Sequence, residues 1–189
     1  PYASPEANGP LRLLVVGGSQ GARVMSDVVP GAIECLDPAL WGRLILTQQV
    51  REEDMARVRA VYTRLKINAE LAPFFSDFPA RLASSHLVIS RSGAGTVAEL
   101  AAIGRPSILV PLPGAIDQDQ FANAGVLAQV DGALRIAQAE FTPARLAAEI
   151  SSFAAEPARL TAMAAAARRV GRLDAAERLA DLVVKIAKI

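Results

Sequence analysis

Residues 13–24 read LLVVGGSQGARV, four apolar residues that lead into a glycine-rich turn and then into helix formers. A short, continuous apolar run is typical of a strand that is buried on both faces, as in parallel sheets. The glycines leave the turn without side-chain bulk, so another molecule can approach its backbone. The unpaired N–H groups and positive dipole end of the following helix are suited to phosphate. We therefore predict a diphosphate-binding turn that includes Gly18, Ser19 and Gln20, with a purely structural tight turn as the alternative.

The strand-then-helix pattern of this stretch recurs along the whole chain. Strand-like apolar runs occupy residues 12–16, 43–47, 67–71, 87–90, 107–110 and 133–136. Helix-like stretches occupy residues 20–36, 52–66, 94–103, 118–129, 143–155, 157–169 and 173–187, and residues 74–85 read as a short turn-rich piece. This alternation predicts an α/β fold, a Rossmann-like doubly wound parallel sheet of about six strands.

Composition narrows the possible classes of protein. The 189 residues are 52% apolar, which is enough for one domain with a full core, and the net charge of +1 does not indicate a nucleic-acid partner. Cys35 and His86 are the only residues of their types, so an internal disulfide, a zinc cluster or a histidine-based triad is not expected. The first ten residues, PYASPEANGP, read as a linker, and residues 11–189 as a ligand-binding domain.

Two common phosphate-binding motifs fit the first turn poorly. A P-loop needs Gly-Lys followed by Ser or Thr, and no lysine follows here. The dinucleotide fingerprint reads G-x-G-x-x-G, whereas this turn reads G-G-x-x-G. That fingerprint also needs an acidic residue at the end of the second strand, where this chain has Gln48 and Gln49. The sequence therefore argues against an NAD site.

A second strand-to-helix turn of the same design is SRSGAGTVAEL, residues 90–100. The amides of Ala94, Gly95 and Thr96 would face a phosphate at the start of the helix. Thr96 and Glu99 are three residues apart and share a helical face, so Glu99 could accept hydrogen bonds from a ribose diol. The alternative is a capping box, in which Thr96 and Glu99 only satisfy the helix N–H groups.

A third turn, VPLPGAIDQDQFANA at residues 110–124, brings amides and carboxylates to the start of a helix. Asp119 and Gln120 offer the paired donors and acceptors that sugar hydroxyls need. Capping of the helix by Asp117 is the alternative. The Asp-Gln-Asp sequence also resembles the D-x-D metal-binding motif, but two helix N-termini can offset a diphosphate charge, so we expect no metal.

The segments GGSQGAR, SRSGAGTVAEL and DQDQFANA, in this order and spacing, resemble the C-terminal, donor-binding half of the MurG-type bacterial glycosyltransferases of family 28. The resemblance extends from Leu11 to the end of the chain. It implies a GT-B architecture of two Rossmann-like domains and metal-independent hexosyl transfer without a cofactor. The reaction it implies moves N-acetylglucosamine from UDP-N-acetylglucosamine to lipid I, giving lipid II for peptidoglycan.

The resemblance also implies a role for each matching residue. The Ser19 turn would lie beside the diphosphate, the backbone of Phe75 would meet the uracil, and Glu99 would bind the ribose. Gln120 and Asp119 would contact the N-acetylglucosamine ring. The family usually has two adjacent glutamines at the last two positions and a smaller aliphatic residue at Phe75, whose ring could here stack on the base.

The same resemblance implies an N-terminal acceptor domain for lipid I, which this chain does not include. We therefore expect the isolated chain to bind UDP-N-acetylglucosamine, to be inactive alone, and to have no nucleic-acid partner. The whole protein would be peripheral to the cytoplasmic side of the bacterial inner membrane. Three alternatives remain open: another UDP-sugar enzyme such as a UDP-N-acetylglucosamine 2-epimerase, a non-enzymatic nucleotide-binding domain, and an interaction domain.

The last predicted helix has an apolar stripe formed by Leu179, Leu182, Val183 and Ile186. The helical spacing of these residues predicts a packing surface. The resemblance implies that the end of the chain crosses to the other domain, which would leave part of this stripe exposed here.

Overall fold

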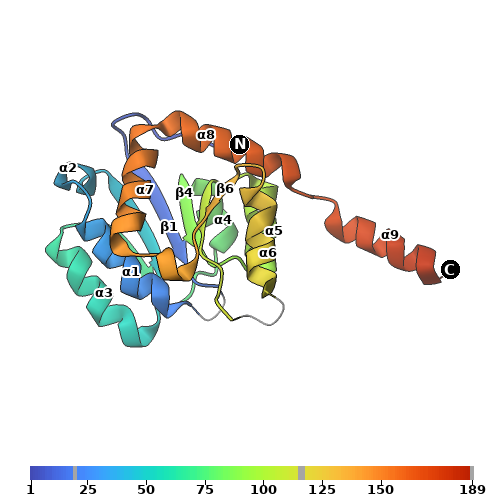
Figure 1. The fold of residues 1–189 in the computed structure, drawn as a ribbon, viewed down its shortest axis with the longest axis horizontal. Helices are drawn as coiled ribbons and strands as arrows, with labels where there is room; N and C mark the ends of the chain where they lie inside the picture. The colour runs from blue at the N-terminus through green and yellow to red at the C-terminus, as the bar shows by residue number, and fades with distance from the viewer. Residues whose placement is uncertain (19–20, 115–117, 188–189) are drawn as a thin grey trace.

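The computed structural model, which describes residues 1–18, 21–114 and 118–187, is built on one six-stranded parallel sheet (Figure 1). The strands lie in the order β3-β2-β1-β4-β5-β6. Their bounds are β1 Leu11–Val16, β2 Leu44–Gln49, β3 Asn68–Ala72, β4 Leu87–Ser90, β5 Ser107–Leu109 and β6 Ala133–Arg135. The predicted Rossmann-like α/β sheet is confirmed, and each strand lies within two residues of its predicted position.

Helices cover both faces of the sheet (Figure 1). One face is covered by α1 Arg23–Glu34, α3 Glu52–Arg64 and α7 Pro143–Ala155. The other face is covered by α4 Phe78–Ser84, α5 Ala94–Ile103 and α6 Asp119–Ala128, and α8 Pro157–Val170 packs against helices of both layers.

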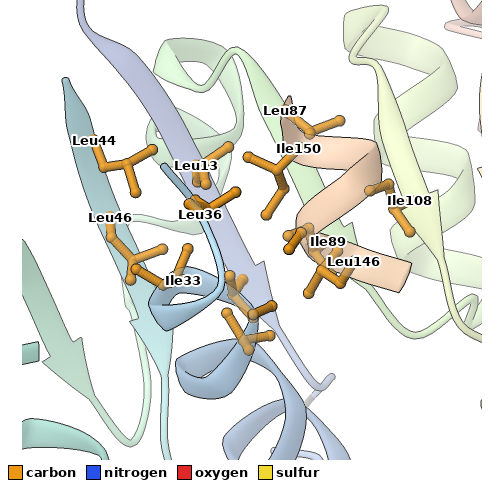
Figure 2. Close-up of a cluster of buried hydrophobic side chains, with 14 of the residues drawn as sticks. Leu13, Ile33, Leu36, Leu44, Leu46, Leu87, Ile89, Ile108, Leu146 and Ile150 are labelled. Carbon is orange, nitrogen blue, oxygen red and sulfur yellow. The ribbon is translucent and has the colours of Figure 1, made fainter. Parts of the chain in front are cut away.

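The two layers follow from the alternation of side chains along buried strands. Leu13 and Val15 of β1 belong to the core on the α1 and α7 side, whereas Leu14 and Val16 belong to the core under α5 and α6. Successive residues of a strand point to opposite faces, so a continuous apolar run supplies both cores. Figure 2 shows the first of these cores, where side chains of α1 and α7 meet those of β1, β2, β4 and β5.

Two short α-helices and the 3-10 helix η2, Gln138–Glu140, were not predicted. The helix α2, Pro38–Trp41, begins where the Asp37 carboxylate accepts a hydrogen bond from the Ala39 N–H at 2.8 Å. The helix α4 lies inside the stretch predicted as turn-rich, and a proline in its first turn supports it. Elements of four and seven residues are too short for hydrophobic periodicity to reveal, which explains why the prediction was wrong here.

The two ends of the described chain behave differently. The Tyr2 hydroxyl donates to the His86 carbonyl at 3.1 Å, and Pro5 is buried, so the predicted linker lies against the domain. By contrast α9, Ala175–Ala187, buries none of its residues and extends away from the sheet (Figure 1). Among the described residues, no helix has the length and apolar content needed to cross a membrane.

The strand order places a topological switch point between β1 and β4. From β1 the chain builds outward through β2 and β3, and it then returns to β4 and builds in the opposite direction. The connections at the carboxyl ends of β1 and β4 therefore diverge and leave a crevice between them. In open α/β sheets, ligands bind in that crevice.

Candidate functional site

A pocket of about 400 Å³ lies at the carboxyl edge of the sheet beside the switch point. It is built from the ends of β1 and β2, the connection between β3 and α4, and the first turns of α5. Its lining residues are Val16, Gly18, Gln49, Phe74, Phe75, Ser76, Phe78, Pro79, Gly95, Thr96 and Glu99. Five of the predicted binding residues, Gly18, Phe75, Gly95, Thr96 and Glu99, are thus brought together in one place.

The turn after β1 forms one wall of this pocket. Gly17 packs so closely that an added Cβ would lie 1.9 Å from the Ala22 nitrogen, and Gly18 has a φ of +90°. The helix α1 that follows has no acidic residue in its first turn and no side-chain cap. The predicted residues Ser19 and Gln20 lie outside the described residues. Gly17 and Gly18 are partly exposed, and Gly18 adds no side-chain bulk where the turn lines the pocket.

The first turn of α5 forms the opposite wall. Gly93 is the N-cap, no side chain caps the helix, and the first turn contains no acidic residue. Because Thr96 is the third residue of the helix and not its N-cap, the capping-box alternative for Thr96 and Glu99 is wrong. The amides of Ala94, Gly95 and Thr96 are in the part of a helix where no intrahelical acceptor exists, so they are available to an anion.

The connection between β3 and α4 carries two adjacent phenylalanines with different surroundings. Phe75 is only 7% exposed, and the Arg81 guanidinium lies 4.3 Å from the centroid of its ring. Phe74 is 66% exposed and also lines the pocket. The sequence pattern gives no role to Phe74, yet its ring is far more exposed in the pocket than that of Phe75.

Arg81 holds this connection in place. Its guanidinium donates to both carboxylate oxygens of Glu70 and, at 2.6 Å, to Asp77, while it covers Phe75. The hydrogen bond from Arg81 keeps the pKa of Asp77 below its ordinary value. A bidentate pair of this kind fixes orientation as well as charge.

We expect Arg81→Met to lower the melting temperature by about 2–6 °C, because exposed ion pairs and a cation–π contact are lost together. The difference from wild type should be present above about pH 4, the ordinary Asp pKa, and should shrink as Asp77 is protonated at lower pH. Thermal denaturation followed by circular dichroism measures both effects. Arg145→Met, which removes only the pair with Glu149, is the matched control, and an equal loss in both variants would contradict this role.

The predicted sugar-binding residues lie at the start of α6, outside the pocket lining. Asp119 and Gln120 are in its first turn, and the N-cap Gln118 has a left-handed φ of 51°. The Gln120 side-chain oxygen accepts from the Leu112 N–H at 3.0 Å. Asp117, the alternative capping residue, lies outside the described residues.

Two side chains after β4 join the α5 and α6 turns. The Ser92 hydroxyl donates to the Gln120 carbonyl at 2.8 Å. The buried Arg91 guanidinium donates to the carbonyls of Val110 and Pro111 at 3.1 and 3.0 Å, and burial lowers its pKa. The first turn of α6 is therefore held next to the segment that leads into α5.

The strand order, the switch point and a pocket at the carboxyl edge of the sheet define a Rossmann-like domain. A family model, the glycosyltransferase family 28 C-terminal domain, matches residues 12–179. The chain belongs to this family.

Individual relatives agree with the family. The UDP-N-acetylglucosamine--N-acetylmuramyl-(pentapeptide) pyrophosphoryl-undecaprenol N-acetylglucosamine transferase of Bradyrhizobium diazoefficiens is 84% identical over 187 residues, which are 99% of this chain and 51% of the relative. The crystal structure of Acinetobacter baumannii MurG is 31% identical with a TM-score of 0.85, and the match covers 97% of this chain and 55% of that one. The chain spans about half the length of the curated relatives it matches.

A more distant solved structure shares the fold alone. The UDP-GlcNAc 2-epimerase from Neisseria meningitidis, bound to UDP-GlcNAc, is 14% identical with a TM-score of 0.62, and the match covers 94% of this chain and 44% of that one. The architecture by itself therefore does not separate transferases from epimerases.

Proposed function

We propose that residues 11–189 form the donor-binding half of a transferase that moves N-acetylglucosamine from UDP-N-acetylglucosamine to lipid I, giving lipid II. Residues 1–10 would lead from an acceptor half that binds lipid I and attaches the protein to the cytoplasmic face of the inner membrane. The 84% identity to a transferase of that name supports this proposal, and it favours transfer over epimerisation. On this proposal the isolated chain binds the donor and does not turn it over.

The observation that carries the proposal is a pocket lined by Gly18 of the glycine-rich turn before α1 and by the first turn of α5. Its only charged lining residue, among the described residues, is Glu99. Two helix dipoles and their free amides favour the negative diphosphate. One carboxylate in such a site needs a neutral partner with hydroxyl donors, and a ribose diol is that partner. Phe74, which lines the pocket and is exposed, would offer an aromatic face to the uracil.

The same arrangement gives the donor half its part in the reaction. When the bond between the sugar and UDP breaks, negative charge grows on the departing diphosphate. Backbone amides and helix dipoles that already point at this group stabilise the charge without reorganising. The base that accepts a proton from the acceptor hydroxyl would come from the other half or from the substrate.

Glu99→Ala should weaken UDP binding by about 1–3 kcal/mol, or roughly 5- to 150-fold, because hydrogen bonds to a charged acceptor are lost. Isothermal titration calorimetry on the 189-residue chain measures this affinity. With 2′,3′-dideoxy-UDP, which has no diol, the wild-type chain and the variant should bind equally. Glu52→Ala, an exposed acidic residue on α3, is the control and should bind UDP as the wild type does.

Three outcomes would contradict the proposal. No heat of binding with UDP or UDP-N-acetylglucosamine would favour a plain interaction domain. Equal affinity for ADP and UDP would favour a general nucleotide-binding domain. Equal loss of UDP and dideoxy-UDP affinity in Glu99→Ala would show that Glu99 does not bind the ribose.

A further inference from the structure

Gln49 occupies a central place at the carboxyl edge of the sheet. It is the last residue of β2, and β2 lies between β1 and β3. Its side chain therefore has the turn after β1 on one side and the connection after β3 on the other. Gln49 is 6% exposed and lines the pocket together with Gly18 and Phe74.

The side-chain amide of Gln49 bonds to both of these segments. Its oxygen accepts a hydrogen bond from the Gly17 N–H at 3.0 Å, and its nitrogen donates to the Pro73 carbonyl at 3.1 Å. Gly17 precedes the proposed phosphate-binding turn, and Pro73 precedes the two phenylalanines. One planar group thus sets the separation between the two parts of the pocket.

An amide is required for this double contact. A carboxylate can only accept, so it would satisfy Gly17 and repel the Pro73 carbonyl, and an asparagine is shorter by one methylene group. The end of the second strand, where an NAD site would need an acidic residue, therefore has a glutamine for a structural reason. The position needs both a donor and an acceptor.

We propose that Gln49 is a positioning residue that holds the Gly17–Gly18 turn and the Phe74–Phe75 segment at the spacing that a single uridine diphosphate spans. This inference rests on the proposed function, because it takes the ligand to be a nucleoside diphosphate. A residue that only stabilised the fold would affect every ligand equally. A positioning residue affects the ligand that bridges both segments more than ligands that touch one of them.

Gln49→Glu tests the donor side of the contact through its pH dependence. The introduced carboxyl group is buried beside a carbonyl oxygen, so its pKa should be raised above the ordinary Glu value of about 4.3. Below that raised pKa the neutral acid can donate to Pro73 and accept from Gly17, as the amide does. Above it the carboxylate repels the Pro73 carbonyl and the diphosphate.

The measured quantity is the ratio of wild-type to variant UDP affinity at each pH. Protonation of the UDP phosphates changes both affinities equally, so it cancels in this ratio. Calorimetry should give a ratio near one at about pH 5 and a ratio of about ten or more at about pH 8. A tenfold ratio corresponds roughly to the loss of one hydrogen bond to a buried group. Gln129→Glu, the same change at the far end of α6, should give a ratio near one at both pH values.

A second variant tests the same inference if Gln49→Glu does not fold. Gln49→Met keeps the volume but bonds to neither segment. Chemical-shift titrations should show about tenfold weaker UDP binding with little change for uridine alone or pyrophosphate alone. Equal weakening for all three ligands would overturn the inference, and so would a pH-independent ratio in Gln49→Glu. If the wild-type chain does not bind UDP at all, the proposed function is wrong and the inference fails with it.

Discussion

A Gly17→Ala chain should lose measurable UDP binding and should be less stable than the wild type by about 3 kcal/mol or more. The added methyl carbon would lie 1.9 Å from the Ala22 nitrogen and 2.5 Å from the Gly21 carbonyl carbon. These are backbone atoms of the same turn, so no side chain can move aside to make room. The turn must open, and the pocket wall that it forms must move with it.

Chemical denaturation measures the stability of this variant, and calorimetry with UDP measures its binding. Gly42→Ala is the matched control, because an added Cβ there has no heavy atom within 4 Å and φ is −67°. That control should be equal to the wild type or more stable by about 0.4–1 kcal/mol, through the lower entropy of its unfolded chain. A Gly17→Ala chain that binds UDP normally would mean that this turn takes no part in the site.

Ile150→Ala should reduce the free energy of unfolding by about 2–5 kcal/mol, whereas Ile150→Val should reduce it by about 0.5–1.5 kcal/mol. Ile150 of α7 is fully buried and belongs to the same core cluster as Leu87, the first residue of β4 (Figure 2). The alanine leaves a cavity that the surrounding strands cannot fill, while the valine removes one methyl group.

Neither Ile150 variant should change the UDP affinity of the folded chain, because Leu87 is at the opposite end of β4 from the pocket. Urea denaturation gives the free energy of unfolding, and calorimetry at a temperature where the chain is folded gives the UDP affinity. A loss of affinity that followed the loss of stability in this series would show that the pocket and the distant core are coupled. The Gly17 and Ile150 variants therefore separate damage to the site from damage to the fold.

Much of the site could be predicted because its main features are local in sequence. A glycine-rich segment between a buried strand and a helix exposes backbone amides wherever the strand lies in the sheet. This is why Gly18, Gly95 and Thr96 could be assigned from the sequence alone, and why all three line the pocket. Short helices such as α2 and α4 could not be predicted, because four to seven residues hold too little periodicity.

Other parts of the site depend on contacts between distant segments. Gln49 is 32 residues from Gly17 and 24 from Pro73, and only the order of the strands places all three together. The ring of Phe75 is covered by Arg81, which is held by carboxylates from two different elements. The hydrogen bond between the Leu112 N–H and the Gln120 side chain likewise exists only in the folded chain.

The amino-acid sequence by itself determined the α/β class, the glycine-rich turns and the resemblance to family 28, because each of these depends on short runs of consecutive residues. Only the tertiary structure decided which strands are neighbours, which phenylalanine is exposed and which side chain joins the two sides of the pocket. The physical reason is that hydrophobic periodicity and turn chemistry act over a few residues. Pocket geometry instead depends on hydrogen bonds and packing between segments that meet only in the folded chain.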